Sequence, residues 1–566
     1  MMTDEPRPDA PDTENLDTEE PDAEEQTVAR ASAWMALGTV ISRVTGFGRL
    51  ILLAWVIGVA LNADLFEAAN TIPNALYILV AGGIFNVVLV PQLVRAMKND
   101  PDGGDAYANR VITLGVVVLG IATVLLTLAV PALLHLVFED ELFTPALQHQ
   151  RESAELLMML CMPQVFFYGV FVLVGQILNA RKRFGPMMWA PIANNVVACA
   201  VILVYYFIFG ASNGADGFTT GEALLLGVGS TAAIALQAVI LVPYLRAAGF
   251  RYRPRFDFRG VGLSHTLRLG VWTLLFILVN QIAYFAIARI ATGANLEGTV
   301  DGKPAAGLAV YSIGFLVSQL PHGVITVSLA TAIMPTLAAL ANERRYDRFQ
   351  LELGRTLRMA MVIIVPLAVA VACLGQPAAA IAGAIGSLGG NTVAIGQTIS
   401  AFSLAMIAFT LHYMMLRGFY ANEDTRTPFF IQLVISIVNI VCAVVLTSLV
   451  EPYRVAAVLA LSYGISYVVG SILSLTLLTR SVGPVIDREM VFFVRRLVVA
   501  VALTAFVTLG VARGLDVAGL EPARAVGGLI TTVIAGLAGA VTYVAAARVV
   551  GLTQLTHLVD SLRRRG

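Results

Sequence analysis

The chain has 566 residues, of which 58% are hydrophobic and 13% are charged, and its mean hydropathy is +0.80. A soluble globular protein of this length is excluded, because such proteins contain about 25% charged residues. The composition predicts an all-α polytopic membrane protein, whose apolar helices of about 20 residues cross the bilayer. The 37 basic and 37 acidic residues give a formal net charge of zero. No nucleic-acid partner is expected.

The first 27 residues form an acidic tail. They contain eleven acidic residues, from Asp4 to Glu25, and a single basic residue, Arg7. The tail is rich in proline and acid, lacks aromatic residues, and has no basic start followed by an apolar core. These features predict a disordered cytoplasmic tail rather than a signal peptide. The rest of the chain is therefore strongly basic.

Two arginines lie in the first predicted span, residues 30–61. Arg43 lies deep in this span, and Arg49 follows it. An arginine at the centre of a membrane helix costs about 2.5–3.5 kcal/mol on insertion scales, so such residues normally face a protein interior or an aqueous cavity. Ser42 adds a hydroxyl, and Gly46 and Gly48 weaken the helix, which makes the two glycines candidate hinges. A guanidinium-lined cavity favours an anionic ligand, and phosphate in particular.

The second predicted span, residues 64–97, carries a polar stripe. Its members recur at steps of three or four residues: Asp64, Glu67, Asn70 with Thr71, Asn74 and Tyr77. Helical periodicity places them on one face, which we expect to meet the arginines of the first span. Pro73 should bend the helix, because proline removes a helical hydrogen bond. Two structural alternatives stay open: an ion pair between Arg43 and Asp64, and an Arg49 side chain that extends to the headgroups.

Fourteen segments are long and apolar enough to cross a bilayer. They lie near residues 30–61, 64–97, 108–138, 153–179, 185–210, 222–246, 266–293, 305–341, 354–385, 395–420, 427–450, 453–479, 490–514 and 524–551. Alternate loops are basic, near residues 95–98, 181–183, 246–259, 344–348, 417–426 and 480–488, as is the end of the chain at 563–565. Because cytoplasmic loops carry the excess of Lys and Arg, both termini are predicted to be cytoplasmic.

An internal repeat is visible at two pairs of landmarks. VPQL, which contains Pro91, resembles MPTL, which contains Pro335, and the loop before Pro186 resembles the loop before Pro428. The two pairs have nearly the same spacing along the chain. This indicates two lobes of six helices each, related by a pseudo-twofold axis along the membrane normal.

The repeat divides the chain into five parts. After the tail 1–27 come the N-lobe 28–247, a basic linker 248–265, the C-lobe 266–480 and a last segment 481–566 with two appended spans and a basic end. The linker is basic and aromatic, so it is predicted to lie on the cytoplasmic membrane surface against anionic headgroups.

The C-lobe offers weaker candidates for a site. Span eight has a sparse polar stripe that comprises Tyr311, Ser318 with Gln319, and His322. We select Gln319 and His322 as candidate substrate contacts, although single residues of this kind more often join helices by hydrogen bonds. The sequence shows no phosphate-binding glycine loop, no clustered metal ligands and no nucleophile with a partner base. No catalytic residue, metal site or cofactor is therefore predicted, and the chain is not expected to be an enzyme.

The first two spans resemble a known family. The similar segments are SRVTGFGR at 42–49, D-x-F-x-x-A from Asp64 to Ala69, IPN at 72–74 and AGGIFNVVLVPQL at 81–93. Together with the fourteen-span, two-lobe plan, they resemble the MurJ/MviN family of lipid II flippases, within the multidrug/oligosaccharidyl-lipid/polysaccharide exporter superfamily. The resemblance extends over about residues 28–551, and an actinobacterial source is expected.

This resemblance implies a flippase of the bacterial plasma membrane. Such a protein moves undecaprenyl-diphosphate-linked disaccharide-pentapeptide from the inner to the outer leaflet for peptidoglycan synthesis and cell shape. It implies that Arg43, Arg49, Asp64 and Asn74 surround a central cationic cavity, and that the two appended spans form a groove for the lipid tail.

The chain departs from better-known family members at four positions. It has Tyr77 where they have a further arginine, Gly82 where they have an acid, and Leu316 and Gln319 where they have an Arg/Glu pair. We therefore expect a less cationic cavity.

The sequence predicts that Arg43 and Arg49 engage the diphosphate. The further candidate contacts are Ser42, Asp64, Glu67, Asn74, Tyr77, Gln319 and His322, and the candidate hinges are Gly46, Gly48 and Pro73. One lobe should rock against the other to open the cavity alternately to each face. Coupling to the membrane potential or to a monovalent cation is left open.

Three other functions fit the sequence less well than a flippase does. A cation-coupled drug or small-molecule exporter of the same superfamily is disfavoured by the positive charge in the first span. A membrane-embedded transferase acting on lipid-linked sugar is disfavoured because no catalytic cluster is found. A non-transporting scaffold for cell-wall synthesis or division proteins is disfavoured by the polar stripe, although the acidic tail is suited to bind such partners.

Overall fold

The computed structural model describes residues 20–79, 96, 102, 104–181, 183–212, 214–257, 263–383 and 391–554. Three helices have a shorter range of described side chains. Side chains are described from residue 37 in the first helix, from 271 in the helix that begins at 263, and up to 381 in the helix that ends at 383. The all-α prediction is confirmed, because these residues form helices and connecting loops. Thirteen helices within the described ranges are long and apolar enough to span a membrane, and they match thirteen of the predicted spans. The predicted span 64–97 is described without a gap only as far as Leu79, so the count of fourteen is not confirmed.

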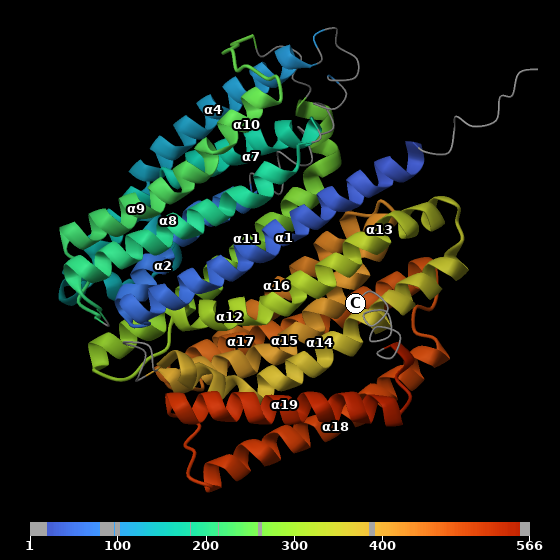
Figure 1. The fold of residues 1–566 in the computed structure, drawn as a ribbon. Helices are drawn as coiled ribbons and strands as arrows, with labels where there is room; N and C mark the ends of the chain where they lie inside the picture. The colour runs from blue at the N-terminus through green and yellow to red at the C-terminus, as the bar shows by residue number, and fades with distance from the viewer. Residues whose placement is uncertain are drawn as a thin grey trace, which may run out of the picture.

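The N-terminal bundle contains the helices up to residue 247, drawn from blue to green in Figure 1. These are α1 (Glu20–Val56), α2 (Leu61–Ile78), α4 (Asp105–Leu128), α5 (Val130–Val137), η2 (Asp140–Phe143), η3 (Pro145–Leu147), α6 (Gln148–Cys161), α7 (Gln164–Ala180), α8 (Gly185–Phe209), α9 (Thr220–Val239) and α10 (Leu241–Ala247). Helix α8 packs against both α1 and α9, and α4 packs against α7. This bundle corresponds to the predicted N-lobe.

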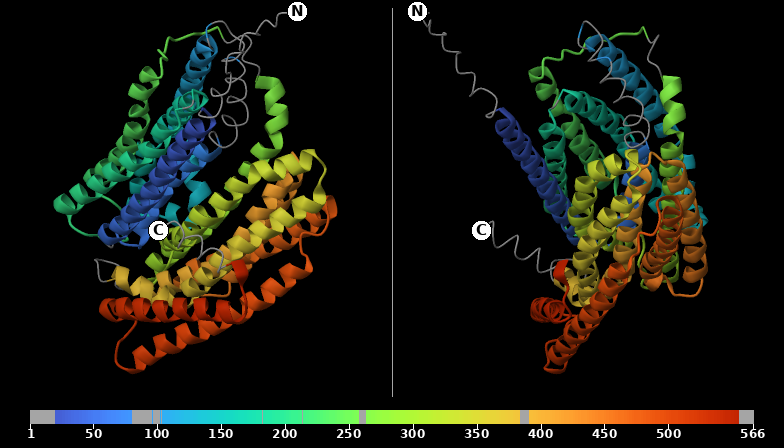
Figure 2. Two further views of the ribbon diagram at one scale, coloured as in Figure 1. Left: turned by 45° about the vertical axis from the view of Figure 1, so that its right-hand side comes forward. Right: turned by 90° about the vertical axis from the view of Figure 1, so that its right-hand side faces the viewer.

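The C-terminal bundle follows in yellow-green to orange (Figures 1 and 2). It contains α11 (Leu263–Asp301), α12 (Leu308–Pro321), η4 (His322–Thr326), α13 (Val327–Asn342), α14 (Tyr346–Gly383), α15 (Thr392–Ala421), α16 (Arg426–Thr447), η5 (Pro452–Arg454) and α17 (Val455–Val482). Helix α15 packs between α14 and α17, and α11 packs on α16. These helices correspond to the predicted C-lobe.

The two appended helices, α18 (Arg488–Val517) and α19 (Ala525–Val549), form a hairpin on the outer side of α14, red in Figure 1. A buried arginine of α14 fixes the start of this hairpin. The Arg358 side chain is 6% exposed and pairs at 3.4 Å with Asp487 and at 3.4 Å with Glu489. Tyr543 of α19 donates a hydrogen bond to the Val362 carbonyl of α14 at 2.6 Å.

Several predicted spans are broken into two helices. The third predicted span becomes α4 and α5, and the fourth becomes α6 and α7, with Pro131 and Pro163 at the breaks. The eighth becomes α12 and α13 joined by the π-helix η4, directly after Pro321. Proline explains these breaks, because it has no N–H for the helical hydrogen bond. Helix α1 begins at Glu20, within the stretch predicted to be a disordered tail, and an acid-rich first turn suits a helix N-terminus.

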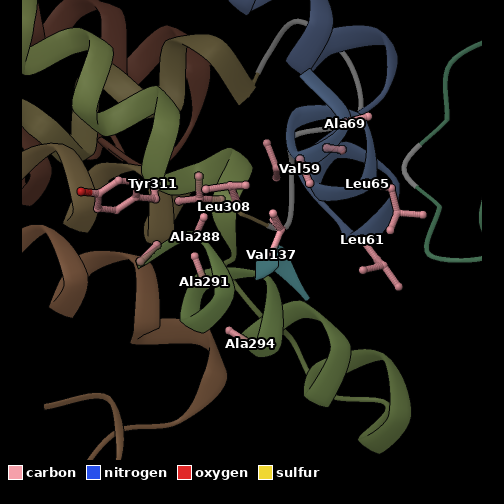
Figure 3. Packing of buried hydrophobic residues seen from close by; sticks show 14 of the residues in the cluster. Val59, Leu61, Leu65, Ala69, Val137, Ala288, Ala291, Ala294, Leu308 and Tyr311 are labelled. Atoms are coloured by element: carbon pink, nitrogen blue, oxygen red, sulfur yellow. The ribbon is translucent and has the colours of Figure 1, made fainter. Parts of the chain in front are cut away.

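Three hydrophobic cores show how the bundles are joined. The buried residues of one core belong to α4–α10 and the following loop. Those of another belong to α13–α19 and the adjoining loops, as far as Leu552. The third is shared by both bundles: Figure 3 shows Val59 and Val137 of the N-terminal bundle near Leu308 of the C-terminal bundle. The bundles therefore share a core only at the end where α1, α5 and α11 finish, and they have separate cores towards the basic loops.

The linker after α10 is extended and is held on α4. The Arg253 N–H donates to Asn109 Oδ1 at 2.7 Å, and the Arg255 N–H donates to Thr113 Oγ1 at 3.0 Å. Asp257 forms an ion pair with Arg110 at 2.7 Å. The hydrogen bonds from Arg110 hold the pKa of Asp257 below its usual range.

Candidate functional site

A cavity of about 590 Å³ lies between the two bundles. Its walls come from α1, α2, α7, α8 and α9 of the N-lobe and from α11, α12, α16 and α17 of the C-lobe. This volume is in the range of sites that bind small molecules or headgroups. The cavity lies beside the shared core, so it occupies the angle between the joined lobes.

Among the residues that the structure describes, three charged ones line the cavity, and all three belong to the N-lobe. They are Arg43 and Arg49 of α1 and Glu67 of α2. Within the described part of the chain, neither guanidinium has a hydrogen-bond or ion-pair partner, while Ser312 donates a hydrogen bond to Glu67 at 3.2 Å. The two arginines therefore keep their donors available to a ligand, and the formal charge of the lining is positive.

Arg43 reaches across the cavity to the C-lobe. Its guanidinium lies against Gly323 of η4, where a Cβ would come within 2.6 Å of the Arg43 Cζ. A side chain at position 323 would therefore force the guanidinium of Arg43 to move. The site on α1 thus depends on a backbone surface of the opposite lobe.

Amides continue the polar wall of the N-lobe. Asn70 and Asn74 of α2 line the cavity with Gln164 of α7 and Asn194 of α8. Gln164 donates to the Asn70 side-chain oxygen at 3.0 Å. The polar stripe predicted for the second span therefore supplies Glu67, Asn70 and Asn74 to the cavity.

Asp64, at the start of the same stripe, is not part of the cavity lining. Its side chain is fully buried, and it accepts three hydrogen bonds from the C-lobe. The donors are the Asn295 side chain at 2.9 Å, the Leu308 N–H at 2.9 Å and the Ala309 N–H at 2.7 Å. Asp64 therefore caps the N-terminus of α12, as carboxylates commonly do, instead of forming the ion pair with Arg43 that was one alternative.

Gly307 makes this capping contact possible. A Cβ at Gly307 would overlap the Asp64 carboxylate and would lie 2.8 Å from the Ala291 carbonyl. Two further contacts join the lobes at the same end. Thr292 donates to the Val137 carbonyl at 2.6 Å, and Arg289 pairs with Asp140 at 3.2 Å.

Four other predicted contacts lie outside the lining. The Ser42 carbonyl accepts a hydrogen bond from Asn195 at 3.0 Å, and Tyr77 stacks on Tyr168 with 4.6 Å between ring centroids. His322 is 5% exposed and lies 3.2 Å from the Thr410 hydroxyl. Gln319 is half-buried on α12, whereas its neighbours Leu316 and Leu320 line the cavity. Their roles in binding stay predictions.

The predicted hinges lie within continuous helices. Helix α1 runs through Gly46 and Gly48, and α2 runs through Pro73. Gly46 lines the cavity, and a Cβ added there would lie 3.4 Å from the Asn195 amide, whereas one at Gly48 would meet nothing within 4 Å.

Sequence reasoning missed the aromatic residues of the cavity. Tyr284, Phe315 and Tyr463 of the C-lobe line it, but an aromatic residue in an apolar helix looks the same whether it faces a core or a cavity. It also missed Asn295, whose signal was an amide at the end of an apolar span. No group of His, Cys, Asp or Glu suited to a metal ion occurs in the described ranges.

Comparisons with known proteins agree on one family. The family model described as lipid II flippase MurJ matches residues 53–518. A probable lipid II flippase MurJ of Haemophilus influenzae is 28% identical over 414 residues, which cover 71% of this chain and 77% of that protein. The corresponding protein of Rhizobium tropici is 28% identical over 395 residues, or 69% and 70% of the two chains.

Two solved structures share the fold. Lipid II flippase MurJ in an inward closed conformation matches with a TM-score of 0.67 at 18% identity, covering 91% of this chain and 98% of that one. An inward-facing multidrug resistance transporter of the MATE family matches with a TM-score of 0.59 at 14% identity, covering 78% and 95%. Because the family model extends over most of the chain, the chain belongs to the MurJ family of lipid II flippases.

Proposed function

We propose that the chain carries lipid II, an undecaprenyl-diphosphate-linked disaccharide-pentapeptide, from the inner to the outer leaflet. A multi-span member of a bacterial flippase family lies in the plasma membrane. The cavity would hold the polar headgroup while the lipid tail stays in the bilayer. This lowers the barrier to transfer, because charged and unpaired polar groups are costly in hydrocarbon.

One observation carries the assignment of the binding site. Arg43 and Arg49 face the same cavity, and no acid of the described chain forms an ion pair with either guanidinium. Guanidinium groups that lack an ion-pair partner beside a lipid bilayer are stabilised when an anion binds them, and their planar donors match phosphate oxygens. We assign the diphosphate to these two residues and the amides of Asn70 and Asn74 to neighbouring polar groups.

The arrangement of the lobes supports alternating access. The polar contacts of Asp64, Arg289 and Thr292 all join the lobes at one end. By the distribution of basic loops, this is the periplasmic end, and both termini are then cytoplasmic. In our proposal these contacts break when the lobes rock, so the cavity opens to the periplasm.

The appended hairpin is suited to guide the lipid tail. Helices α18 and α19 expose large apolar side chains, among them Phe492, Phe506 and Leu537. An isoprenoid chain would lie against this surface while the headgroup occupies the cavity. Since the headgroup is anionic, we expect its outward movement to respond to membrane potential or to a counter-ion.

The test combines variants with a leaflet-resolved assay. Arg43→Ala and Arg49→Ala should abolish growth in cells depleted of their own flippase and leave lipid II on the inner leaflet, at unchanged protein levels. Arg355→Ala is a matched control, because Arg355 is exposed on α14 and pairs with Glu352. Full growth with both cavity variants would refute the site.

The same assay separates the competing functions. A transferase would change the chemical structure of the precursor, whereas a flippase changes only its leaflet. A drug exporter would leave lipid II accessible on the outer leaflet after depletion. A scaffold would tolerate Arg43→Ala and Arg49→Ala, because neither side chain reaches a partner from inside the cavity.

A further inference from the structure

The two faces of the cavity differ in chemistry. The charged residues that the structure describes in its lining, Arg43, Arg49 and Glu67, all lie on α1 and α2. The lining residues from the C-lobe are uncharged, and four of them are aromatic: Tyr284, Tyr311, Phe315 and Tyr463. A ligand in the cavity therefore meets cations on one side and aromatic rings on the other.

The aromatic face is a packed wall. Phe315 and Tyr463 lie edge to face, with centroids 5.7 Å apart and an interplanar angle of 89°. Phe402, which is fully buried, supports both rings from behind, at 5.8 Å from Phe315 and 6.0 Å from Tyr463. Tyr284, Phe315 and Tyr463 are only half-buried, so parts of their rings face the cavity.

The wall is close to the cationic side of the site. Phe315 precedes Gly323 by eight residues, which is about 12 Å along the helix axis. The guanidinium of Arg43 lies against Gly323. A ligand whose anionic group is held at Arg43 can therefore extend along α12 to the aromatic wall.

Rigid aromatic surfaces recognise flat apolar faces, because an aromatic ring has a negative face that attracts positively polarised edges. The C–H bonds on one face of a pyranose ring provide such a partner, and a sugar also carries hydroxyls that suit the nearby amides of Asn280 and Asn439. Phosphates and carboxylates gain nothing from an uncharged aromatic wall. The chemistry of this face thus fits a saccharide better than it fits an anion.

We propose that Tyr284, Phe315 and Tyr463 form a sugar-stacking wall, which receives the saccharide of the headgroup while Arg43 and Arg49 hold its diphosphate. The inference rests on the proposed function and deepens it, since it assigns the C-lobe contacts of the same ligand. It also orients the ligand, with the diphosphate towards the N-lobe and the sugar towards the C-lobe.

The wall is tested with two ligands. They share the lipid tail and the diphosphate and differ only in the rest of the headgroup. The purified full chain is titrated with lipid II and with undecaprenyl diphosphate, which shares the tail and the diphosphate but has no saccharide or peptide. Phe315→Leu and Tyr463→Leu keep an apolar side chain and remove the ring. Each should weaken lipid II binding by about three- to tenfold and leave undecaprenyl diphosphate binding unchanged.

Two controls separate stacking from packing. Tyr463→Phe retains the ring and should bind lipid II as the wild type does. Phe402→Leu loosens the support behind the wall but leaves both cavity-facing rings in place. It should weaken lipid II binding less than Tyr463→Leu does and leave undecaprenyl diphosphate binding unchanged. A third ligand, with the disaccharide but no pentapeptide, should keep the selective loss in Tyr463→Leu, which assigns the contact to the sugar.

The outcomes are distinct. If Phe315→Leu and Tyr463→Leu weaken the binding of lipid II and of undecaprenyl diphosphate equally, the wall does not stack on sugar. The same conclusion follows if they weaken the binding of neither ligand. If the loss disappears with the ligand that lacks the pentapeptide, the rings contact peptide and the proposal is wrong. If the wild-type chain binds neither polyprenyl ligand, the proposed function itself fails.

Discussion

Replacing Asp64 with asparagine should separate the lobes at the end where they are joined. The Asp64 carboxylate accepts three hydrogen bonds, two on Oδ2 and one on Oδ1, and every partner is a donor from the C-lobe. Asparagine has nearly the same shape but only one accepting oxygen. The side-chain NH2 of asparagine would therefore face at least one N–H of the C-lobe, and it cannot accept a hydrogen bond from that N–H.

The magnitude follows from these contacts. In the best orientation the single amide oxygen of the Asp64→Asn variant would keep the donors of Asn295 and Leu308 and lose the Ala309 N–H. Losing a hydrogen bond to a charged group and leaving its donor unpaired costs about 2–4 kcal/mol. Loss of the negative charge at the N-terminus of α12 adds about 0.3–1 kcal/mol. A total of about 3 kcal/mol shifts the equilibrium between joined and separated lobes by about a hundredfold.

Pulsed electron spin resonance would measure this shift. Labels at Ala146 and Val300, which are both exposed near the joined end, report the distance between the lobes in a chain whose native cysteines are replaced by alanine. Asp64→Asn should move population to longer distances. Glu67→Gln is the matched control. Among the described residues, Glu67 accepts a single interlobe hydrogen bond, from Ser312, and glutamine can still accept it.

A second variant perturbs the same contact from the C-lobe. Gly307→Ala places a Cβ in the space of the Asp64 carboxylate, so it should shift the distances in the same direction. If Asp64→Asn and Gly307→Ala both give the same distance distribution as the wild type, the capping contact does not hold the lobes together and our reasoning fails.

Three further predictions concern other parts of the chain. Gly323→Ala should displace the guanidinium of Arg43 and weaken binding of undecaprenyl diphosphate about tenfold, measured by titration against Arg43→Ala as the reference for full loss. Arg358→Ala should destabilise the appended hairpin by about 1–2 kcal/mol, a modest value because its acidic partners are largely exposed; unchanged thermal unfolding would contradict this. Arg110 lowers the pKa of Asp257. The ion pair between them should therefore be fully formed above the usual carboxylate pKa and should be lost as the pH falls through the lowered pKa. Hydrogen exchange of the linker measures this loss, and Asp257→Asn is the control whose exchange should not depend on this titration.

The sequence predicted the class of fold and part of the lining of the candidate site. Apolar runs of bilayer length predicted the spans, because length and hydropathy determine which segments cross a membrane. Helical spacing predicted that Glu67, Asn70 and Asn74 share a face, and this face does line the cavity. Arg43 and Arg49 were candidates because an arginine in an apolar helix needs a polar environment.

The two ends of the polar stripe could not be assigned from the sequence. From Asp64 to Tyr77 the stripe is about 20 Å long, and the cavity is in contact with its middle. Asp64 instead meets the start of α12, more than 240 residues away along the chain, and Tyr77 meets Tyr168. Such partners depend on how the lobes pack, and periodicity within one helix contains no information on that packing.

The length of α1 has a mechanical consequence. This helix has 37 residues, so it is about 55 Å long, whereas the hydrocarbon core is about 30 Å thick. Much of α1 therefore projects from the bilayer as a continuous rod rigidly connected to Arg43 and Arg49. Tilting the projecting end of α1 would also move the two guanidinium groups within the cavity. A force applied to α1 outside the membrane would therefore change their affinity for an anion.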